Sequence, residues 1–264
     1  MKMRRDFVHQ RQRGFTLLEL LIVLGILGLV LGAVFSQMGV AQQRMTTEGV
    51  KLDDFQEARD FVDQFFRDIN QIGDPNARLA DTTSPSWSPA LATPSSYLWA
   101  SPYINDNRFA MGLVQIGTTW LRFEGSENGV GTVQSVIYKV NGSGSCTLCL
   151  QRSQVNKTYN ADPLLGQALP NWGTEVNDVL SPVIFRYFQT DGTEVIPPLA
   201  GLDYTTSQSN AQKLANIKTI QINLTIRNPK VMDQKTGQPI ETTFEGEVSL
   251  NNCSMAAAGQ GMSC

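Results

Sequence analysis

Histidine is nearly absent from this chain of 264 residues, because His9 is the only one. His9 lies within residues 1–14, so a chain that loses these residues contains no histidine. Triads of the Ser-His-Asp type, Cys-His pairs and histidine-based metal sites all need an imidazole. The sequence therefore predicts no enzyme of these classes and no metal centre built on histidine.

The chain also lacks the basic excess of a nucleic-acid-binding protein, since 21 Lys and Arg stand against 24 Asp and Glu. No glycine-rich phosphate loop follows a strand-like run, so nothing indicates a nucleotide site. Apolar residues are plentiful, at 41%, which argues against a disordered chain and is enough for one large domain or two small ones. We expect no nucleic-acid partner and no cofactor.

A basic leader is followed directly by an apolar segment. Residues 1–14 hold five basic side chains and one acidic one, and Glu19 is the only charged residue in 15–35. About 20 apolar helical residues span the hydrocarbon core of a bilayer, so residues 15–35 predict a membrane helix. The basic flank predicts a cytoplasmic leader and an exported remainder. An uncleaved signal anchor would have the same profile.

Two residues at this junction favour a more specific interpretation. Glu19 would lie in lipid, where insertion scales assign a charged side chain a cost of about 2.5–3.5 kcal/mol, and such residues are usually functional. Cleavage after the small residue Gly14 would create an α-amine at Phe15, with a pKa of about 7.7–8.0. That amine, above all in a neighbouring copy, would neutralise the Glu19 carboxylate. Assembly of several copies would then relieve an unpaired charge.

Residues 13–24 read RGFTLLELLIVL and resemble the processing site of type IV prepilins and type II secretion pseudopilins. The resemblance rests on Gly, Phe, Thr and Glu at fixed offsets before an unbroken apolar run. It implies that prepilin peptidase cleaves between Gly14 and Phe15 and methylates Phe15, and that Glu19 acts in subunit recruitment. The partners that it implies are this peptidase, other minor and major pilin subunits, the inner-membrane assembly platform and the membrane itself.

Helical periodicity continues beyond the membrane segment. Apolar residues recur every three or four positions: Leu52, Phe55, Ala58, Val62, Phe65, Phe66, Ile69 and Ile72. Gly73 and Pro75 then end the helix. We expect one long helix over 15–72, in which 15–35 is the transmembrane or filament-core part. Residues 36–72 are amphipathic and are expected to pack on a globular head formed by residues 73–264.

Strand-like runs follow a loop at 74–96, namely 108–116, 118–123, 132–140, 145–151 and 179–188. The strongest alternation lies between Thr219 and Leu250 and predicts an antiparallel hairpin. A long helix followed by antiparallel strands is the α+β pattern, and the resemblance implies a pilin-like arrangement of the helix on the sheet domain. This hairpin after a loop-rich middle is most similar to PilW/PulJ-type, J-like minor pilins.

The four cysteines are expected to be oxidised outside the cytoplasm, and four cysteines allow three pairings. A disulfide between Cys253 and Cys264 resembles the C-terminal loop of some pilins. Cys146 and Cys149 are three apart in a strand-like run, so a bond between them requires a turn. No helix follows them to support redox chemistry, and the spacing of the second pair does not suit zinc. Asp191 and Asp233 begin hairpin turns that need no calcium.

The leading hypothesis is a minor pilin that primes or caps a type IV pilus, in a machinery for adhesion, motility or DNA uptake. The alternative is a J-like minor pseudopilin of a type II secretion system, and the long loops at 74–107 and 153–178 favour the pilus. Both predict a single-pass inner-membrane protein with a periplasmic C-terminal domain, which later enters the filament or its tip. A binding module would use tryptophans expected on loops: Trp87, Trp99 and Trp172.

Overall fold

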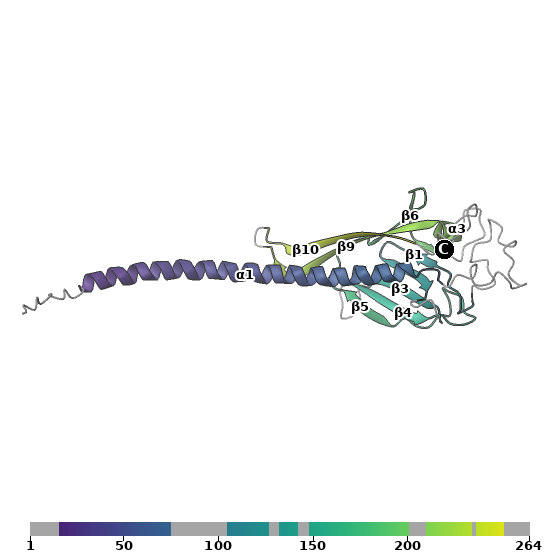
Figure 1. Cartoon of the computed structure of the whole chain (residues 1–264), viewed down its shortest axis with the longest axis horizontal. Helices are drawn as coiled ribbons and strands as arrows, with labels where there is room; N and C mark the ends of the chain where they lie inside the picture. The colour runs from purple at the N-terminus through teal and green to yellow at the C-terminus, as the bar shows by residue number, and fades with distance from the viewer. Residues whose placement is uncertain are drawn as a thin grey trace, which may run out of the picture. The chain divides into compact units, whose positions relative to one another are not determined.

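The computed structural model describes residues 16–74, 105–126, 132–141, 148–200, 210–233 and 236–250. Helix α1 (Leu17–Asn70) comes first, and antiparallel strands with the short helix α3 (Asn210–Ala215) follow it (Figure 1). The predicted α+β class is confirmed. The chain divides into two compact units, Met1–Gly49 and Val50–Cys264. Helix α1 therefore contributes its first part to one unit and its second part to the other.

The first part of α1, up to Gly49, is covered by no described residue of its own unit. Residues 16–46 are exposed throughout, and the exposed fraction reaches 80% at Leu17 and 78% at Leu29. Helix α1 is long and apolar enough to cross a membrane, and none of its most apolar 18-residue window is buried. The helix here satisfies its own backbone hydrogen bonds, so the side chains alone require a partner.

The described strands of the second unit form two antiparallel sheets. The six-stranded sheet has the order β5-β4-β3-β2-β1-β8, and the four-stranded sheet has the order β10-β9-β6-β7. The strands of the first are β1 (Leu113–Ile116), β2 (Trp120–Gly125), β3 (Gln134–Asn141), β4 (Cys149–Asn156), β5 (Trp172–Val176) and β8 (Leu199–Ala200). Those of the second are β6 (Phe185–Gln189), β7 (Glu194–Val195), β9 (Ile217–Met232) and β10 (Pro239–Ser249).

The late hairpin predicted from alternation is β9 and β10. These strands pair from Thr219↔Ser249 to Met232↔Pro239, with one irregularity beside Pro239. The even-numbered residues of β9 between 220 and 226 are buried, and the odd-numbered ones are partly exposed. A period of two thus puts one face of the hairpin in the core and the other towards solvent.

The second part of α1 packs against both sheets. The Phe65 ring lies 5.5 Å from the ring of Tyr138 on β3 and 5.5 Å from that of Phe185 on β6. Phe61 and Phe65 are at most 1% exposed. A spacing of four residues places these two rings on one side of the helix, where they fill the space between the two sheets.

The expected apolar stripe on this part of α1 was partly wrong. Leu52 and Phe55 are 61% and 48% exposed, whereas Phe61, which the periodicity passed over, is buried. The periodicity considered one face of the helix, but the two sheets pack on a wider part of its circumference. The buried apolar residues of α1 begin at Ala58. An apolar residue on the helix is buried only where one of these sheets reaches it.

Several strand boundaries also differ from expectation. Strand β1 begins at Leu113 rather than at 108, because Asp106 accepts hydrogen bonds from the backbone and guanidinium of Arg108 in a turn. Strand β6 begins only at Phe185, after Pro182, which cannot donate to a ladder. Trp172, expected on a loop, is the first residue of β5 and is 39% exposed. Trp87 and Trp99 lie outside the described residues.

Candidate functional site

The start of α1 has a local hydrogen-bonded cap. The Glu19 amide N–H donates to Thr16 Oγ1 at 3.3 Å, and the Leu20 amide donates to the Thr16 carbonyl oxygen at 3.2 Å. Thr16 is therefore the N-cap and Glu19 the third helical residue, which is the spacing of a capping box. A carboxylate in the first turn also interacts favourably with the helix dipole. The Thr16-x-x-Glu19 spacing was visible in the sequence, but its capping role was missed.

The predicted processing residues border this cap. Gly14 and Phe15 lie outside the described residues, so cleavage and methylation there stay predictions. Glu19 lies on the exposed first turn of α1, and its carboxylate directly precedes the uncovered apolar segment. The arrangement presents one acidic group at the beginning of a long apolar surface. Such a surface can be covered by lipid or by apolar helices of other chains.

Comparison with known proteins bears on this segment alone. Residues 9–35 match the family model described as the prokaryotic N-terminal methylation motif. The chain carries a type IV prepilin-like motif. This motif implies processing by prepilin peptidase and assembly with other pilins, and together with the apolar helix it indicates membrane anchoring. It supports a structural protein of the pilin or pseudopilin kind. No curated protein and no solved structure matches the chain.

In the second unit, a buried polar cluster joins α1 to the six-stranded sheet. Asp68 Oδ2 accepts hydrogen bonds from Tyr138 Oη at 2.6 Å and from Arg152 Nε at 2.7 Å. Gln64 Nε2 donates to the other oxygen, Asp68 Oδ1, at 2.7 Å. Burial, and then the charge of Asp68, raise the pKa of Tyr138 well above its ordinary value. The tyrosine thus stays a donor, and the cluster fixes α1 on β3 and β4.

A second cluster is an ion pair buried completely, between Lys157 and Glu124. Lys157 Nζ lies 2.8 Å from Glu124 Oε2, and both side chains have 0% exposure. Lys157 also donates to the Phe109 carbonyl oxygen at 2.9 Å, and the Met111 amide donates to Glu124 Oε2 at 3.0 Å. Burial raises the pKa of Glu124, while the charge of Lys157 opposes this rise. No sequence pattern links two residues so far apart, so this pair was not predicted.

The surroundings of this pair show that it is structural. The Glu124 carbonyl oxygen accepts a hydrogen bond from the Gly73 amide at 3.0 Å, directly where the chain leaves α1. A Cβ at Gly125 would lie 2.4 Å from the Gln71 carbonyl oxygen, so only glycine permits this close approach of backbones. The pair thus lies beside the junction between the end of α1 and β2.

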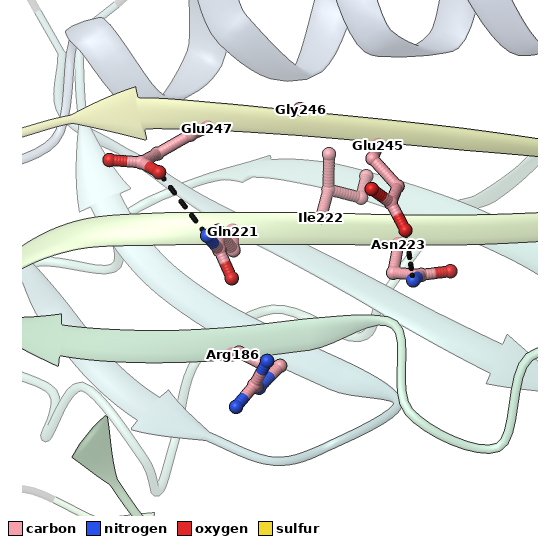
Figure 2. Close-up of a pocket in the computed structure, with 7 residues that line it drawn as sticks. All are labelled: Arg186, Gln221, Ile222, Asn223, Glu245, Gly246 and Glu247. Atoms are coloured by element: carbon pink, nitrogen blue, oxygen red, sulfur yellow. Dashed lines mark hydrogen bonds between the residues drawn. The ribbon is translucent and has the colours of Figure 1, made fainter.

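A hollow of about 470 Å³ lies on the outer face of the four-stranded sheet (Figure 2). Its lining residues are Arg186, Gln221, Ile222, Asn223, Glu245, Gly246 and Glu247. The polar ones bond across strands: Gln221 donates to Glu247 at 3.2 Å, and Asn223 donates to Glu245 at 3.1 Å. The lining contains no cysteine, serine or histidine. It is a polar surface with two carboxylates.

The cysteines and the turns complete the predicted sites. Cys149 is buried at the start of β4 and is disulfide-bonded. Cys146, Cys253 and Cys264 lie outside the described residues, so the pairing stays a prediction. The turn carboxylates accept backbone hydrogen bonds, Asp191 from Thr193 and Asp233 from Thr236. Within the described ranges, no group of three or more His, Cys, Asp or Glu is placed to hold a metal ion.

Proposed function

We propose that this protein is a minor pilin that primes or caps a type IV pilus and acts structurally rather than as an enzyme. One observation carries the proposal: the methylation motif is followed by a helix whose apolar side chains are uncovered in the single chain. Before assembly, lipid would cover these side chains in the inner membrane, and the second unit would lie in the periplasm. In the filament, the corresponding helices of other minor and major pilins would replace the lipid.

The cap at Thr16 gives the recruitment step a structural basis. Cleavage by prepilin peptidase after Gly14 and methylation of Phe15 would leave a cationic N-terminus one residue before the cap. The hydrogen bond from the Glu19 amide to Thr16 fixes the first turn, so the Glu19 carboxylate is held at a defined position. The N-terminal amine of an adjacent subunit would pair with it there, while the inner-membrane assembly platform delivers that subunit.

A J-like pseudopilin of a type II secretion system shares this chemistry and is the alternative. The motif supports both, and so does the apolar helix. The loop expected at 153–178 is shorter in the structure, because β4 and β5 take up its two ends. The size of the second unit still favours the pilus, because its two sheets and the connection between β4 and β5 enlarge it beyond what a short secretion filament needs.

Two substitutions at Glu19 separate the charge from the cap. Glu19→Gln keeps a residue that suits a capping box but removes the charge, and Glu19→Ala removes both. We expect both variants to be cleaved and methylated at Phe15 but to be depleted at least about tenfold from sheared pili. Without the Glu19 carboxylate, the N-terminal amine of an adjacent subunit would be buried among apolar helices with no opposite charge. Glu48→Gln, at an exposed acid farther along α1, is the matched control.

The measurements are mass spectrometry of the mature N-terminus and quantitative immunoblotting of purified filaments. Normal incorporation of the Glu19→Gln variant would reduce Glu19 to a helix cap and remove the recruitment mechanism. A mature chain that keeps Met1 would leave a signal anchor and contradict the proposed function altogether.

A further inference from the structure

Strand β10 is an edge strand in the part of the chain that the structure describes. The order β10-β9-β6-β7 places it at one end of the four-stranded sheet, and β9 is the one strand that pairs with it among the described residues. It is 11 residues long. An edge of this length presents a row of backbone N–H and C=O groups that another extended chain can continue.

The outer face of β10 carries carboxylates that the fold does not neutralise. Glu241 is paired with the Arg227 guanidinium at 2.7 Å. Glu245 and Glu247 are bonded instead to the neutral amides of Asn223 and Gln221 (Figure 2). Two carboxylates on the same face, two residues apart along this edge, therefore have no cation paired with them among the described residues and can meet a basic incoming strand.

The inner face of the same edge is apolar and incompletely covered. The Phe55 ring lies against the Phe244 ring of β10 in a tilted pair with centroids 4.7 Å apart, yet 48% of Phe55 is exposed. A Cβ at Gly246 would lie 2.9 Å from Phe66 Cζ, so glycine lets this ring lie against the β10 backbone. We call Leu52, Phe55, Phe66 and Phe244 the α1–β10 seam.

The order of contacts across the sheet shows which side of the seam is open. Phe65 contacts Phe185 on β6, while Phe66 and Phe55, farther round α1, contact β10. Leu52 lies still farther round the helix and is 61% exposed. One more strand beyond β10 would place its inward side chains over this part of the seam.

A second copy of this chain does not supply such a strand. Pairing two β10 edges would bring the Glu245 and Glu247 carboxylates of both copies onto one face, where like charges across strands are destabilising. The other sheet-edge strands β5, β7 and β8 contain no Lys or Arg. Since none of these described edge strands is basic, charge complementarity favours a strand of a different protein.

We propose that the outer edge of β10 is a docking site for a strand of a different protein, with basic residues on one face and apolar residues on the other. The basic side chains pair with Glu245 and Glu247, and the apolar ones cover the α1–β10 seam. Main-chain hydrogen bonds to β10 supply the register. This surface lies in the second unit and does not depend on whether the chain enters a pilus.

The test uses the full-length chain in nanodiscs of phosphatidylcholine, a lipid without net charge that does not compete for a cationic probe. The probe is an acetylated and amidated eight-residue peptide of alternating Lys and Val. We expect it to bind and to slow amide hydrogen exchange in β10. The same peptide with every backbone nitrogen methylated cannot donate to β10 and is expected not to bind. A Glu-Val peptide is the charge control.

Charge reversal on the chain gives the matched variants. Glu245→Lys combined with Glu247→Lys is expected to raise the Kd of the Lys-Val peptide about tenfold or more, from the loss of two cross-strand charge pairs and the gain of repulsion. Asp60→Lys combined with Asp63→Lys changes the same charge on the exposed face of α1 and is expected to leave the Kd within about twofold.

Three results would overturn the proposal. Equal binding of the methylated peptide would reduce the site to a charged surface without strand pairing. An unchanged Kd in the Glu245 and Glu247 double variant would remove the carboxylates from the site. Protection of β10 that rises with protein concentration in the absence of peptide would assign the edge to a second copy.

Discussion

The two parts of α1 belong to one continuous helix but are completed in different ways. Residues 16–46 expose every side chain, whereas Phe61, Phe65 and Ile69 are at most 1% exposed against the sheets. The second part finds its partners within the chain. The first part has apolar side chains of the same kind and finds no partner among the described residues of its own unit.

This difference separates folding from assembly along a single element. Burial of the second part stabilises the second unit, because apolar area leaves water when the chain folds. The described residues of the first unit bury none of the first part, so a covering medium or other chains would explain its apolar composition. A substitution in α1 should therefore affect stability or assembly according to the part in which it lies.

The largest loss of stability is expected from a substitution in the second part of α1. Phe65→Ala should lower the free energy of unfolding of the second unit by about 4–5 kcal/mol, the upper range for a buried aromatic, because its ring contacts both sheets. Leu29→Ala is the matched change in the first part and should leave this free energy unchanged, since Leu29 is 78% exposed. Urea unfolding of the full chain in detergent, followed by tryptophan fluorescence, measures both. Equal losses in the two variants would contradict the division of α1.

The next effect concerns the buried ion pair beside the end of α1. Lys157→Met leaves the Glu124 carboxylate buried without its cation and should destabilise the second unit by about 3–4 kcal/mol at pH 8. The double variant with Glu124→Gln removes both charges and should recover most of the loss. If the single variant is as stable as the parent in the same urea titration, the pair has no role at this junction.

The pH dependence of this variant has a defined sign. Burial raises the pKa of Glu124 in the folded state above its unfolded value, and Lys157 opposes that rise. Without Lys157 the folded pKa rises further, so the folded state binds a proton more tightly than the unfolded state. The stabilisation from protonation is present at low pH and is lost as the pH rises through the folded pKa. The deficit of Lys157→Met should therefore be smaller at pH 5 than at pH 8, and the double variant should lose this dependence.

Patterns among neighbouring residues predicted the elements whose formation depends on neighbouring residues, namely the long helix and the late hairpin. The length and apolar character of α1 and the alternation in β9 and β10 identified the helix and the hairpin. Burial of Phe61 rather than Phe55 depends on where two sheets meet the helix, and no periodicity contains that information. The short edge strand at Trp172 includes a glycine and is largely exposed, so it left no alternating signal.

The candidate site was predicted unevenly for the same reason. Glu19 stands out because it interrupts an apolar run, and residues 9–35 match a known motif. The contacts of Asp68 with Tyr138 and of Glu124 with Lys157 join residues that are distant in sequence. Asp68 is 2% exposed. Only the packed sheets bring its partners to it.

A smaller effect tests the role of Asp68 in the second part of α1. Tyr138→Phe removes the hydroxyl that donates to Asp68 Oδ2 at 2.6 Å. The loss should be about 1.5–3 kcal/mol, as for a hydrogen bond to a charged group, because Arg152 and Gln64 still hold the carboxylate. Tyr159→Phe, at a tyrosine that is 70% exposed, is the control and should have no measurable effect. A Tyr138→Phe chain that unfolds at the parental urea midpoint would show that the cluster does not hold α1 on the sheet.

The smallest effect concerns the first part of α1, where a substitution is not expected to change the stability of the second unit. Thr16→Ala removes the cap on the Glu19 amide and should cost about 1 kcal/mol of helix stability at this end. Amide exchange in the first turn should then be about fivefold faster in nanodiscs, with an unchanged urea midpoint for the second unit. Thr46→Ala is the control, since the Thr46 hydroxyl donates to the Gln42 carbonyl oxygen within the helix and caps nothing. If Thr16→Ala exchanges normally but is depleted from filaments like the Glu19 variants, Thr16 contacts another subunit instead of ordering the helix start. If exchange accelerates and incorporation falls with it, the defined position of Glu19 is what recruitment requires.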